Sequence, residues 1–349
     1  MKTKKIITAV LPILLWGIAI SVLSAAAGNE VVLMTHDSFS VSKGVAAAFE
    51  KETGATLRIL KAGDAGAALN QAILSKKNPM ADVFFGVDNT FLSRAIREDL
   101  FAAYDSPLLA RIPEALQLDR QNRLLPVDFG DVCLNYDRAW FSRRNTPPPE
   151  SLADLAQSPY AGLTVVQNPA TSSPGLAFLL ATVAAFGENG YQEYWRQLQQ
   201  NNVLVTDGWK EAYWGHFTAA SSGNRPIVVS YATSPPAEVH FSEKKLAEAP
   251  TAAVTAPGTC FRQIEFVGIL AGTQNRLLAE KLIDFMLSKQ FQEDIPLQMF
   301  VFPASKDAVL PPVFVKHAAT AQRPAELSPE TIATRREIWI EGWAEAVLH

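Results

Sequence analysis

The sequence predicts an α/β protein built as two lobes, and three observations support this. Short apolar strands alternate with helical segments from residue 31 onward, which is the pattern of β-α-β units with parallel strands. Three consecutive prolines at residues 147–149 interrupt the alternation, and it then starts again. About 320 residues follow an apolar N-terminal segment, and this is too long for one simple core.

The N-terminal segment is predicted to be a signal peptide covering residues 1–27. Lys2, Lys4 and Lys5 precede an apolar run at residues 6–23 and a stretch of small residues that ends at Ala27. We expect cleavage after Ala27 and export to the periplasm. An uncleaved membrane anchor is the alternative, but the apolar run is short for one. No cysteine stands directly after the run, so a lipoprotein anchor is not supported.

The charge of the exported chain argues against nucleic acid as a partner. Without the three leader lysines, 28 basic residues remain against 35 acidic ones, a net charge of −7. No basic cluster occurs along the chain, whereas binding to phosphate backbones needs one.

The first lobe is predicted to open with strands at residues 31–35, 57–60 and 82–86. Helices at residues 41–51 and around Leu69 lie between them. After the third strand, Asp88 is predicted to cap the helix that carries Phe91. A long strand-like stretch at residues 124–137 follows and is able to carry the chain into the second lobe.

The second lobe repeats the alternation. Strands are predicted at residues 165–166, 203–206 and 227–231, and a helix begins at Leu176. A strand at residues 263–271 then leads to a helix that carries Leu282 and to a shorter one around Phe291, which Pro296 is expected to break. The last helix is predicted to start at Ser328 and to pack as a closing element.

The turn before Leu176 is a candidate binding site. Thr171, Ser172 and Ser173 place hydroxyls and backbone N–H groups at a helix start, where the positive end of the helix dipole suits an anionic or strongly polar ligand group. Ordinary N-capping is the alternative, and from these residues alone it is the more frequent role.

Known catalytic and metal motifs are absent from the sequence. It has no GxSxG elbow, no phosphate-binding P-loop, no GxGxxG and no cysteine beside a histidine. The five histidines lie far apart and form no metal-ligand spacing. We therefore expect no enzymatic activity, no cofactor and no metal. A periplasmic hydrolase that uses Ser172 or Ser173 with a nearby base is the rival hypothesis.

Several stretches together resemble the thiamine-binding subfamily of periplasmic solute-binding proteins, the receptors of ATP-driven importers. They are residues 35–39, 81–83, 86–89, 126–130, 168–175, 208–213 and 230–235. The resemblance implies a type II periplasmic-binding-protein fold, in which each lobe is a mixed sheet flanked by helices and a hinge closes the cleft on ligand. It also implies a monomer that delivers its ligand to an ABC permease in the inner membrane. On this basis we assign residues 28–131 and 258–349 to the first lobe and residues 132–257 to the second.

The same resemblance implies a set of ligand contacts. The matching positions are Asp64, Ala65, Ser172, Ser173, Trp209, Tyr231, Ala232, Thr233 and Ser234. Aromatic faces and a carboxylate suit a planar cation, and the serines suit a phosphate or hydroxyethyl tail. Each residue also has a structural interpretation, because Trp209 could be a core anchor and Asp64 could only order its turn. Phe300 and Trp339 are expected in the core.

The chain departs from the family pattern at several ligand positions. The family's Trp-containing insertion is reduced to residues 40–42, and Phe300, Ala237 and Ala170 stand where the family has Trp, Tyr and Arg. The ligand is therefore predicted to be thiamine, a precursor or phosphate of it, or another small cation. A ferric-ion or polyamine receptor is a further alternative, although iron receptors of this fold need adjacent tyrosines and Tyr231 is followed by Ala232.

Cys133 and Cys260 are the only cysteines in the chain. In an exported protein they form either one disulfide or two buried thiols. Both lie on the strands assigned to the lobe crossover, which run side by side in the resembled family, so a disulfide is compatible with the resemblance.

Overall fold

The computed structural model describes residues 29–348, so the predicted signal peptide lies outside the described residues. In the part of the chain that is described, no helix has both the length and the apolar character needed to cross a membrane.

Strands and helices alternate along the chain as predicted. The strands are β1 (Glu30–Thr35), β2 (Thr56–Lys61), β3 (Val83–Asp88), β4 (Phe101–Ala102), β5 (Leu125–Asp137), β6 (Thr164–Gln167), β7 (Leu204–Thr206), β8 (Ile227–Tyr231), β9 (Thr251–Val254), β10 (Phe261–Leu270) and β11 (Phe302–Pro303). The helices are α1 (Lys43–Thr53), α2 (Ala65–Leu74), α3 (Leu92–Arg97), α4 (Arg138–Arg144), α5 (Ser173–Phe186), α6 (Tyr191–Gln200), α7 (Trp209–Glu211), α8 (Pro235–Phe241), α9 (Arg276–Leu287), α10 (Lys289–Gln298), α11 (Pro312–His317) and α12 (Pro329–Val347).

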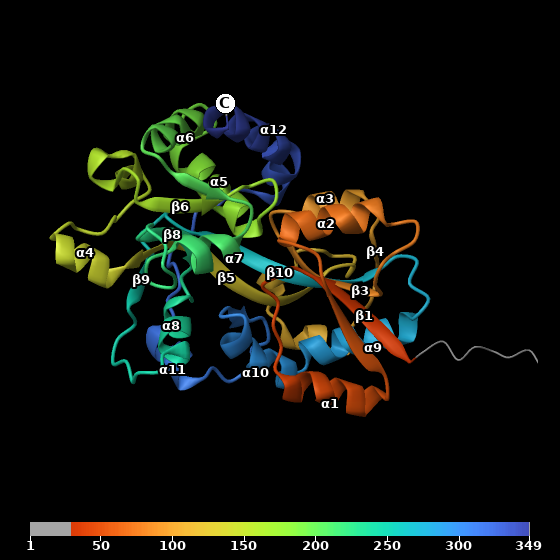
Figure 1. Cartoon of the computed structure of the whole chain (residues 1–349). Helices are drawn as coiled ribbons and strands as arrows, with labels where there is room; N and C mark the ends of the chain where they lie inside the picture. The colour runs from red at the N-terminus through yellow and green to blue at the C-terminus, as the bar shows by residue number, and fades with distance from the viewer. Residues whose placement is uncertain (1–28, 349) are drawn as a thin grey trace, which may run out of the picture.

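One continuous mixed sheet runs through two lobes, in the strand order β2-β1-β3-β10-β5-β8-β6-β7 (Figure 1). Within the first lobe β1 is parallel to β2 and β3, and within the second β6 is parallel to β7 and β8. The long strands β5 and β10 are antiparallel to each other and connect the lobes. The α/β class and the two-lobed architecture predicted from the sequence are therefore confirmed.

Local signals explain where the first helices begin and end. Ser42 caps α1 by accepting from the Val45 N–H, and Gly54 ends the helix in the left-handed conformation, with φ of 68°. Asp64 precedes α2 and accepts from the Ala65 N–H at 2.7 Å. Asp64 follows closely after the end of β2, so its carboxylate lies at the carboxyl end of the parallel strands.

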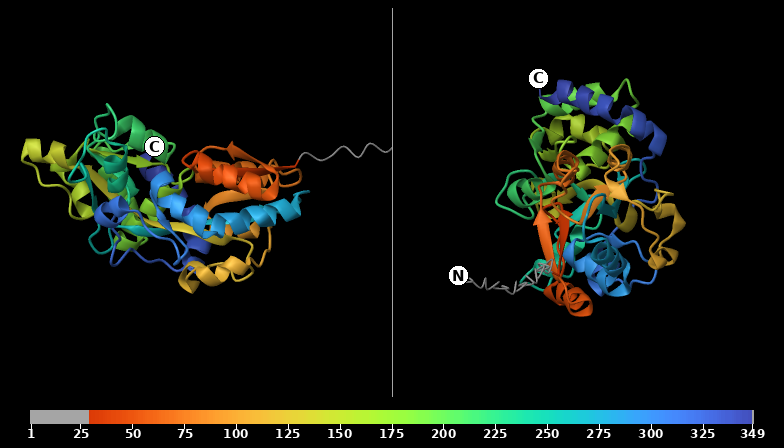
Figure 2. Two further views of the ribbon diagram at one scale, coloured as in Figure 1. Left: turned by 90° about the horizontal axis from the view of Figure 1, so that it is seen from below. Right: turned by 90° about the vertical axis from the view of Figure 1, so that its right-hand side faces the viewer.

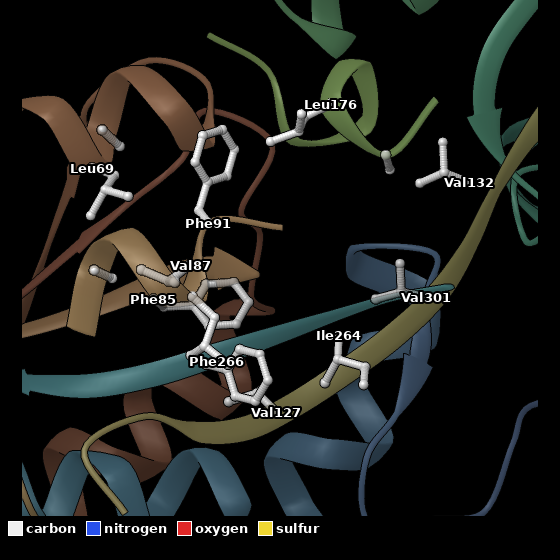
Figure 3. Packing of buried hydrophobic residues seen from close by; sticks show 14 of the residues in the cluster. Leu69, Phe85, Val87, Phe91, Val127, Val132, Leu176, Ile264, Phe266 and Val301 are labelled. Carbon is white, nitrogen blue, oxygen red and sulfur yellow. The ribbon is translucent and has the colours of Figure 1, made fainter. Parts of the chain in front are cut away.

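The hydrophobic core is continuous between the lobes. Phe85, Phe266 and Val127 pack together from the neighbouring strands β3, β10 and β5 (Figure 3). Leu69 of the first lobe and Leu176 of the second belong to the same buried cluster. Burial of this apolar surface stabilises the crossing strands together with the helices that cover them.

The last helix, α12, straddles the two lobes. It packs mainly against α6 and α5 of the second lobe and more lightly against α3 of the first (Figures 1 and 2). Trp339 and Trp343 are buried in this contact, so the prediction that Trp339 is a core residue is confirmed. This helix lies within the range 258–349 that was assigned to the first lobe, and it contacts both lobes.

Two local predictions were wrong. Pro296 does not break its helix, since α10 continues to Gln298; the proline removes one backbone bond only two residues before the helix ends. Phe300 is only half-buried and adopts a left-handed conformation, with φ of 55°. Its ring packs on that of Phe241 with 5.3 Å between the centroids, and Phe241 is exposed to solvent.

Cys133 and Cys260 form a disulfide, with their Cα atoms 4.4 Å apart. Both residues are fully buried where β5 meets the start of β10. The bridge therefore links the two crossing strands near the junction of the lobes and closes a loop in which 127 positions separate the cysteines.

We predict that removing the disulfide lowers the free energy of unfolding by about 2–4 kcal/mol, because the crosslink restricts the unfolded chain. The variant with Cys133→Ala and Cys260→Ala should unfold at a lower denaturant concentration than the oxidised protein. Dithiothreitol should destabilise the wild type but not this variant. Two free thiols titrated in the unfolded, unreduced wild type would contradict the assignment.

Candidate functional site

A cleft of about 750 Å³ lies between the lobes, beyond the carboxyl ends of the strands. Its lining comes from the loops after β1 and β2 in the first lobe and from those after β6 and β7 in the second. The lining residues are Asp37, Ser38, Gly63, Asp64, Ala67, Thr171, Asp207, Gly208, Lys210, Glu211, Trp214 and Gly215. Parallel strands place their ligand crevice at this edge.

Asp64 joins the two lobes at the base of the cleft. One carboxylate oxygen accepts from the Ala65 N–H of its own helix, and the other accepts from the Trp209 N–H of the second lobe at 2.8 Å. A Cβ added at Gly208 would lie 2.8 Å from that oxygen, so this close approach needs a glycine. Burial raises the pKa of Asp64, while the hydrogen bonds from Trp209 and Ala65 act in the opposite direction. Asp64 thus both orders its turn and faces the cleft.

The start of α2 docks on the turn before α5. The backbone N–H groups of Gly66 and Ala67 donate to the Thr171 carbonyl at 3.0 and 3.3 Å. A Cβ on Gly66 would lie 2.8 Å from that oxygen. Ala65 is buried behind this contact and does not line the cleft.

The two serines at the start of α5 are buried and do not cap it through their side chains. The helix begins at Ser173, three residues before the predicted start, and Ser172 occupies the N-cap position without a side-chain capping bond. The Ser173 hydroxyl instead donates to Asp88 of the first lobe and accepts from the Gln263 amide at 2.8 Å. The capping interpretation is therefore wrong for these side chains, and Ser173 connects the lobes.

Asp88 does not cap α3 as predicted, because Phe91 holds the N-cap position of that helix without a side-chain capping bond, but it orders the turn before the helix. One of its oxygens accepts from the Thr90 N–H at 2.8 Å and the Phe91 N–H at 3.2 Å, which orders the turn into α3. The other oxygen accepts from Ser173. Burial raises the pKa of Asp88 to about 7, with the charge of Glu265 acting in the same direction.

An acidic row crosses the sheet beneath the cleft, formed by Asp88, Glu265 and Asp128. Glu265 on β10 lies opposite Asp88 on β3 and opposite Asp128 on β5. Like charges on directly opposite residues repel, and burial together with Glu265 raises the pKa of Asp128 well above its usual range. His36 lies 3.4 Å from Glu265; burial acts to lower the pKa of His36, but the charge of Glu265 raises it overall.

Two tryptophans lie at the cleft, and only one of them lines it. Trp209 is half-buried, stacks on Tyr213 at 4.9 Å between ring centroids, and donates its indole N–H to Ser230 at 2.8 Å. Trp214 lines the cleft and is 42% exposed. The sequence reasoning singled out Trp209 and missed Trp214, although Trp214 directly follows the motif at residues 208–213.

The strand end at residues 231–234 lies behind the cleft lining. Tyr231 donates to the Gln263 side-chain oxygen at 3.2 Å, so Gln263 connects Tyr231 with Ser173. Ala232, Thr233 and Ser234 are buried, and Ser234 bonds Ser230 at 2.8 Å. The structure thus brings the predicted residues together in two groups, Asp64 with Trp209 and Ser173 with Tyr231.

Negative charge predominates in the cleft. Its lining contains Asp37, Asp64, Asp207 and Glu211 but only one cation, Lys210. Among the residues that the structure describes, no group of three or more His, Cys, Asp or Glu is arranged to hold a metal ion. The site is therefore suited to a small organic cation that is recognised by carboxylates and aromatic faces.

Two α/β lobes joined by crossing strands, with a polar cleft between them, define a class of solute-binding receptors. The family model described as bacterial extracellular solute-binding protein matches residues 78–321, and the chain belongs to this family.

More particularly, the chain resembles thiamine-binding periplasmic proteins. It is 33% identical to the one from Salmonella typhimurium and 32% identical to the one from Escherichia coli, over 91% of this chain and 93% of each relative. A solved structure of a periplasmic thiamin binding protein superposes with a TM-score of 0.81 at 30% identity, covering 91% of this chain and 96% of the other. The family resemblance and the fold expected from the sequence are confirmed.

The buried acids and His36 give a prediction for pH. A carboxyl whose pKa is raised by folding destabilises the folded state once it ionises, so stability falls as pH rises. A histidine whose pKa is raised by folding stabilises the folded state while it is protonated, and this stability is also lost as pH rises through that pKa. For Asp88, a rise from 3.8 to about 7 corresponds to about 4 kcal/mol lost between those pH values. We expect the melting temperature to be about 5 °C or more lower at pH 8 than at pH 5.

Differential scanning calorimetry at both pH values measures this difference. Asp88→Asn keeps an oxygen to accept from Thr90 and Phe91, and it should reduce the difference. A melting temperature that rises between pH 5 and pH 8 would contradict the assignment of these groups.

Proposed function

We propose that the protein is a periplasmic receptor of an ABC importer that binds thiamine or a thiamine-like or phosphorylated derivative in the interlobe cleft and delivers it to the permease. The similarity to thiamine-binding periplasmic proteins over most of both chains supports this proposal. The observation that carries it is the position of Asp64, a carboxylate that faces the cleft and holds the second lobe through the Trp209 N–H.

The cleft chemistry fits such a ligand. Asp64 pairs with an amino group or a thiazolium ring, and Trp214 offers a face to a planar cation. Closing the lobes over the ligand removes water from both groups, which strengthens their attraction for the cation. A bound cation also offsets the negative charge of the cleft lining, to which Asp37, Asp64, Asp207 and Glu211 contribute.

The proposal is for a receptor and not an enzyme. The Ser173 hydroxyl is held between the Asp88 carboxylate and the Gln263 amide, and Ser172 is fully buried. Neither serine lines the cleft, so the hydrolase hypothesis has no exposed nucleophile at the start of α5. We expect the ligand to be recovered unchanged after long incubation.

We also propose the division into two lobes that the family resemblance implies. Residues 28–131 and 258–349 form the first lobe and residues 132–257 the second, with α12 shared between them. We further propose that the exported protein acts as a monomer without nucleic acid, and that it lacks the signal peptide of residues 1–27. N-terminal sequencing of the exported protein would test the cleavage after Ala27.

A receptor for another small cation is the second candidate, because an acid-rich cleft favours cations in general. Ferric ion is less well supported. Tyr231 bonds Gln263 behind the cleft, and Ala232 follows it in place of a second tyrosine.

Isothermal titration calorimetry with thiamine, thiamine monophosphate and the free pyrimidine tests the proposed function. We expect saturable one-to-one binding of thiamine, and native mass spectrometry of the purified protein should show a copurifying ligand of the same class. Failure of all three compounds to bind would leave the receptor fold without the thiamine assignment.

A further inference from the structure

Trp214 lies on a π-helical turn, which is a rare element of protein structure. The turn covers Ala212–His216 and continues α7, and the Phe217 N–H donates to the Ala212 carbonyl at 3.1 Å. Such turns occur mostly singly and often at functional sites. Tyr213 on this turn is buried, whereas the next residue, Trp214, lines the cleft. A single helical turn is not stable in water by itself, so contacts with the rest of the lobe must hold it.

The solvent-facing side of this turn offers it little support. Gly215 has no side chain, and the nearest atom to a Cβ built there would be the Glu211 Cγ at 3.9 Å. His216 approaches Glu211 to 3.9 Å, but both side chains remain accessible to solvent. Exposed ion pairs contribute little to stability. The turn therefore depends on its buried side.

On the buried side, Tyr213 and Trp209 form a stacked pair against which Trp214 packs. The centroids of the stacked rings lie 4.9 Å apart, with 21° between the ring planes. The Trp214 ring stands across both, at 74° to Tyr213 and 88° to Trp209, with centroid distances of 5.0 and 6.3 Å. Aromatic rings favour edge-to-face contacts at such distances. The direction of the Trp214 ring therefore depends on where the stacked pair is held.

The stacked pair is anchored at two points to the junction of β8 and α8. The Trp209 indole N–H donates to Ser230 at 2.8 Å, and Ser230 bonds Ser234. The Tyr213 hydroxyl donates to Glu238 on α8 at 2.7 Å. Burial raises the pKa of both Tyr213 and Glu238, and the charge of Glu238 raises that of Tyr213 further, so the hydroxyl keeps the proton that it donates. A hydrogen bond to a carboxylate is stronger than one between neutral groups, which makes Glu238 the stronger anchor.

We propose that Glu238 is a positioning residue, which holds Trp214 toward the cleft through the Tyr213 hydroxyl. The inference rests on the proposed function and deepens it, because Trp214 is the aromatic face that the cleft offers to a planar cation. Glu238 does not line the cleft, so it acts on the ligand through the aromatic residues.

Calorimetric titration with thiamine compares Glu238→Ala with Glu238→Gln. Alanine leaves the Tyr213 hydroxyl without its acceptor, and we expect it to weaken binding by about threefold to tenfold, which is part of the contribution of a tryptophan face. Glutamine keeps an oxygen that accepts from Tyr213 and should restore the affinity to within about twofold of the wild type. A loss of less than about twofold in folded Glu238→Ala, or an equal loss in Glu238→Gln, would overturn the inference.

The double variant of Glu238→Ala and Trp214→Ala tests whether Glu238 acts through Trp214. Adding Glu238→Ala to Trp214→Ala should weaken binding by less than about twofold more, because substitutions that act through the same residue do not add. A full additional loss would overturn the inference.

Tyr213→Phe removes the same hydrogen bond from its donor side, and it should lose as much affinity as Glu238→Ala. Tyr194→Phe is its matched control. The buried Tyr194 hydroxyl donates to the Leu152 carbonyl at 2.7 Å in the same lobe, away from the cleft lining. Tyr194→Phe should therefore leave the affinity unchanged. An equal loss of affinity in both variants would show a general effect of a lost buried bond and overturn the inference.

Near-ultraviolet circular dichroism of the ligand-free protein separates this inference from the proposed function. Aromatic rings in fixed packing give the signal in this range. The signal should change in Glu238→Ala and in Trp214→Ala but not in Glu238→Gln, and an unchanged spectrum in folded Glu238→Ala would overturn the inference. If the wild type binds no thiamine, the proposed function fails, and this spectrum still decides whether Glu238 holds Trp214. Should Glu238→Ala not fold, Tyr213→Phe takes its place in each comparison.

Discussion

Asp64→Asn should weaken thiamine binding by about 30-fold or more. The substitution keeps the size of the side chain and an oxygen for the Ala65 N–H, but it removes the charge that faces both the cleft and the Trp209 N–H. Loss of one partner from a buried charge pair costs about 2–5 kcal/mol, and each 1.4 kcal/mol is about a tenfold change in affinity. Calorimetric titration of the folded variant with thiamine measures the loss.

Asp207→Asn is the matched comparison for this experiment. Asp207 also lines the cleft, but it is exposed, so its neutralisation should cost no more than about threefold. If Asp64→Asn lost as little as Asp207→Asn, Asp64 would only order the start of α2, which was the structural alternative given by the sequence.

The position of Asp64 could be predicted from the sequence, because it depends only on the order of a strand, a capping residue and a helix along the chain. A strand that ends in a capping residue at a helix start must place that residue at the carboxyl edge of a parallel sheet. The strand at residues 227–231 was placed correctly for a similar reason, since apolar residues are bounded there by polar ones. Trp209 and Asp64 were both selected by the family resemblance, but their hydrogen bond depends on how the two lobes meet.

The acidic row of Asp88, Glu265 and Asp128 could not be predicted from the order of residues along the chain. Asp128 and Glu265 are far apart in the sequence and become neighbours only through the antiparallel register of β5 and β10. An isolated Asp inside an apolar strand is the one signal that the sequence gives, because a buried carboxylate needs a partner or a proton. The serines at the start of α5 show the same limit. Serine is a residue type that often caps helices, but the Ser173 hydroxyl donates to Asp88, which lies in the other lobe.

Trp214 is the cleft residue that the sequence reasoning missed, and Trp214→Ala should weaken thiamine binding by more than about tenfold. Its side chain lines the cleft, whereas the Trp209 ring is held behind it by Tyr213 and Ser230. A cation on a tryptophan face in a desolvated site is worth about 2 kcal/mol, and alanine removes that face completely. Thiamine binding should also change the intrinsic fluorescence of the wild type, and much of this change should disappear in Trp214→Ala.

Trp209→Phe is the matched control, because phenylalanine keeps an aromatic ring to stack on Tyr213 and removes the bond to Ser230. We expect it to lose less than about fivefold in affinity, since one neutral hydrogen bond contributes about 1 kcal/mol or less. The opposite order, in which Trp209→Phe loses more than Trp214→Ala, would place the bound cation against Trp209. The lobes would then have to close differently around the ligand, with the Trp209 ring moved out from behind Tyr213.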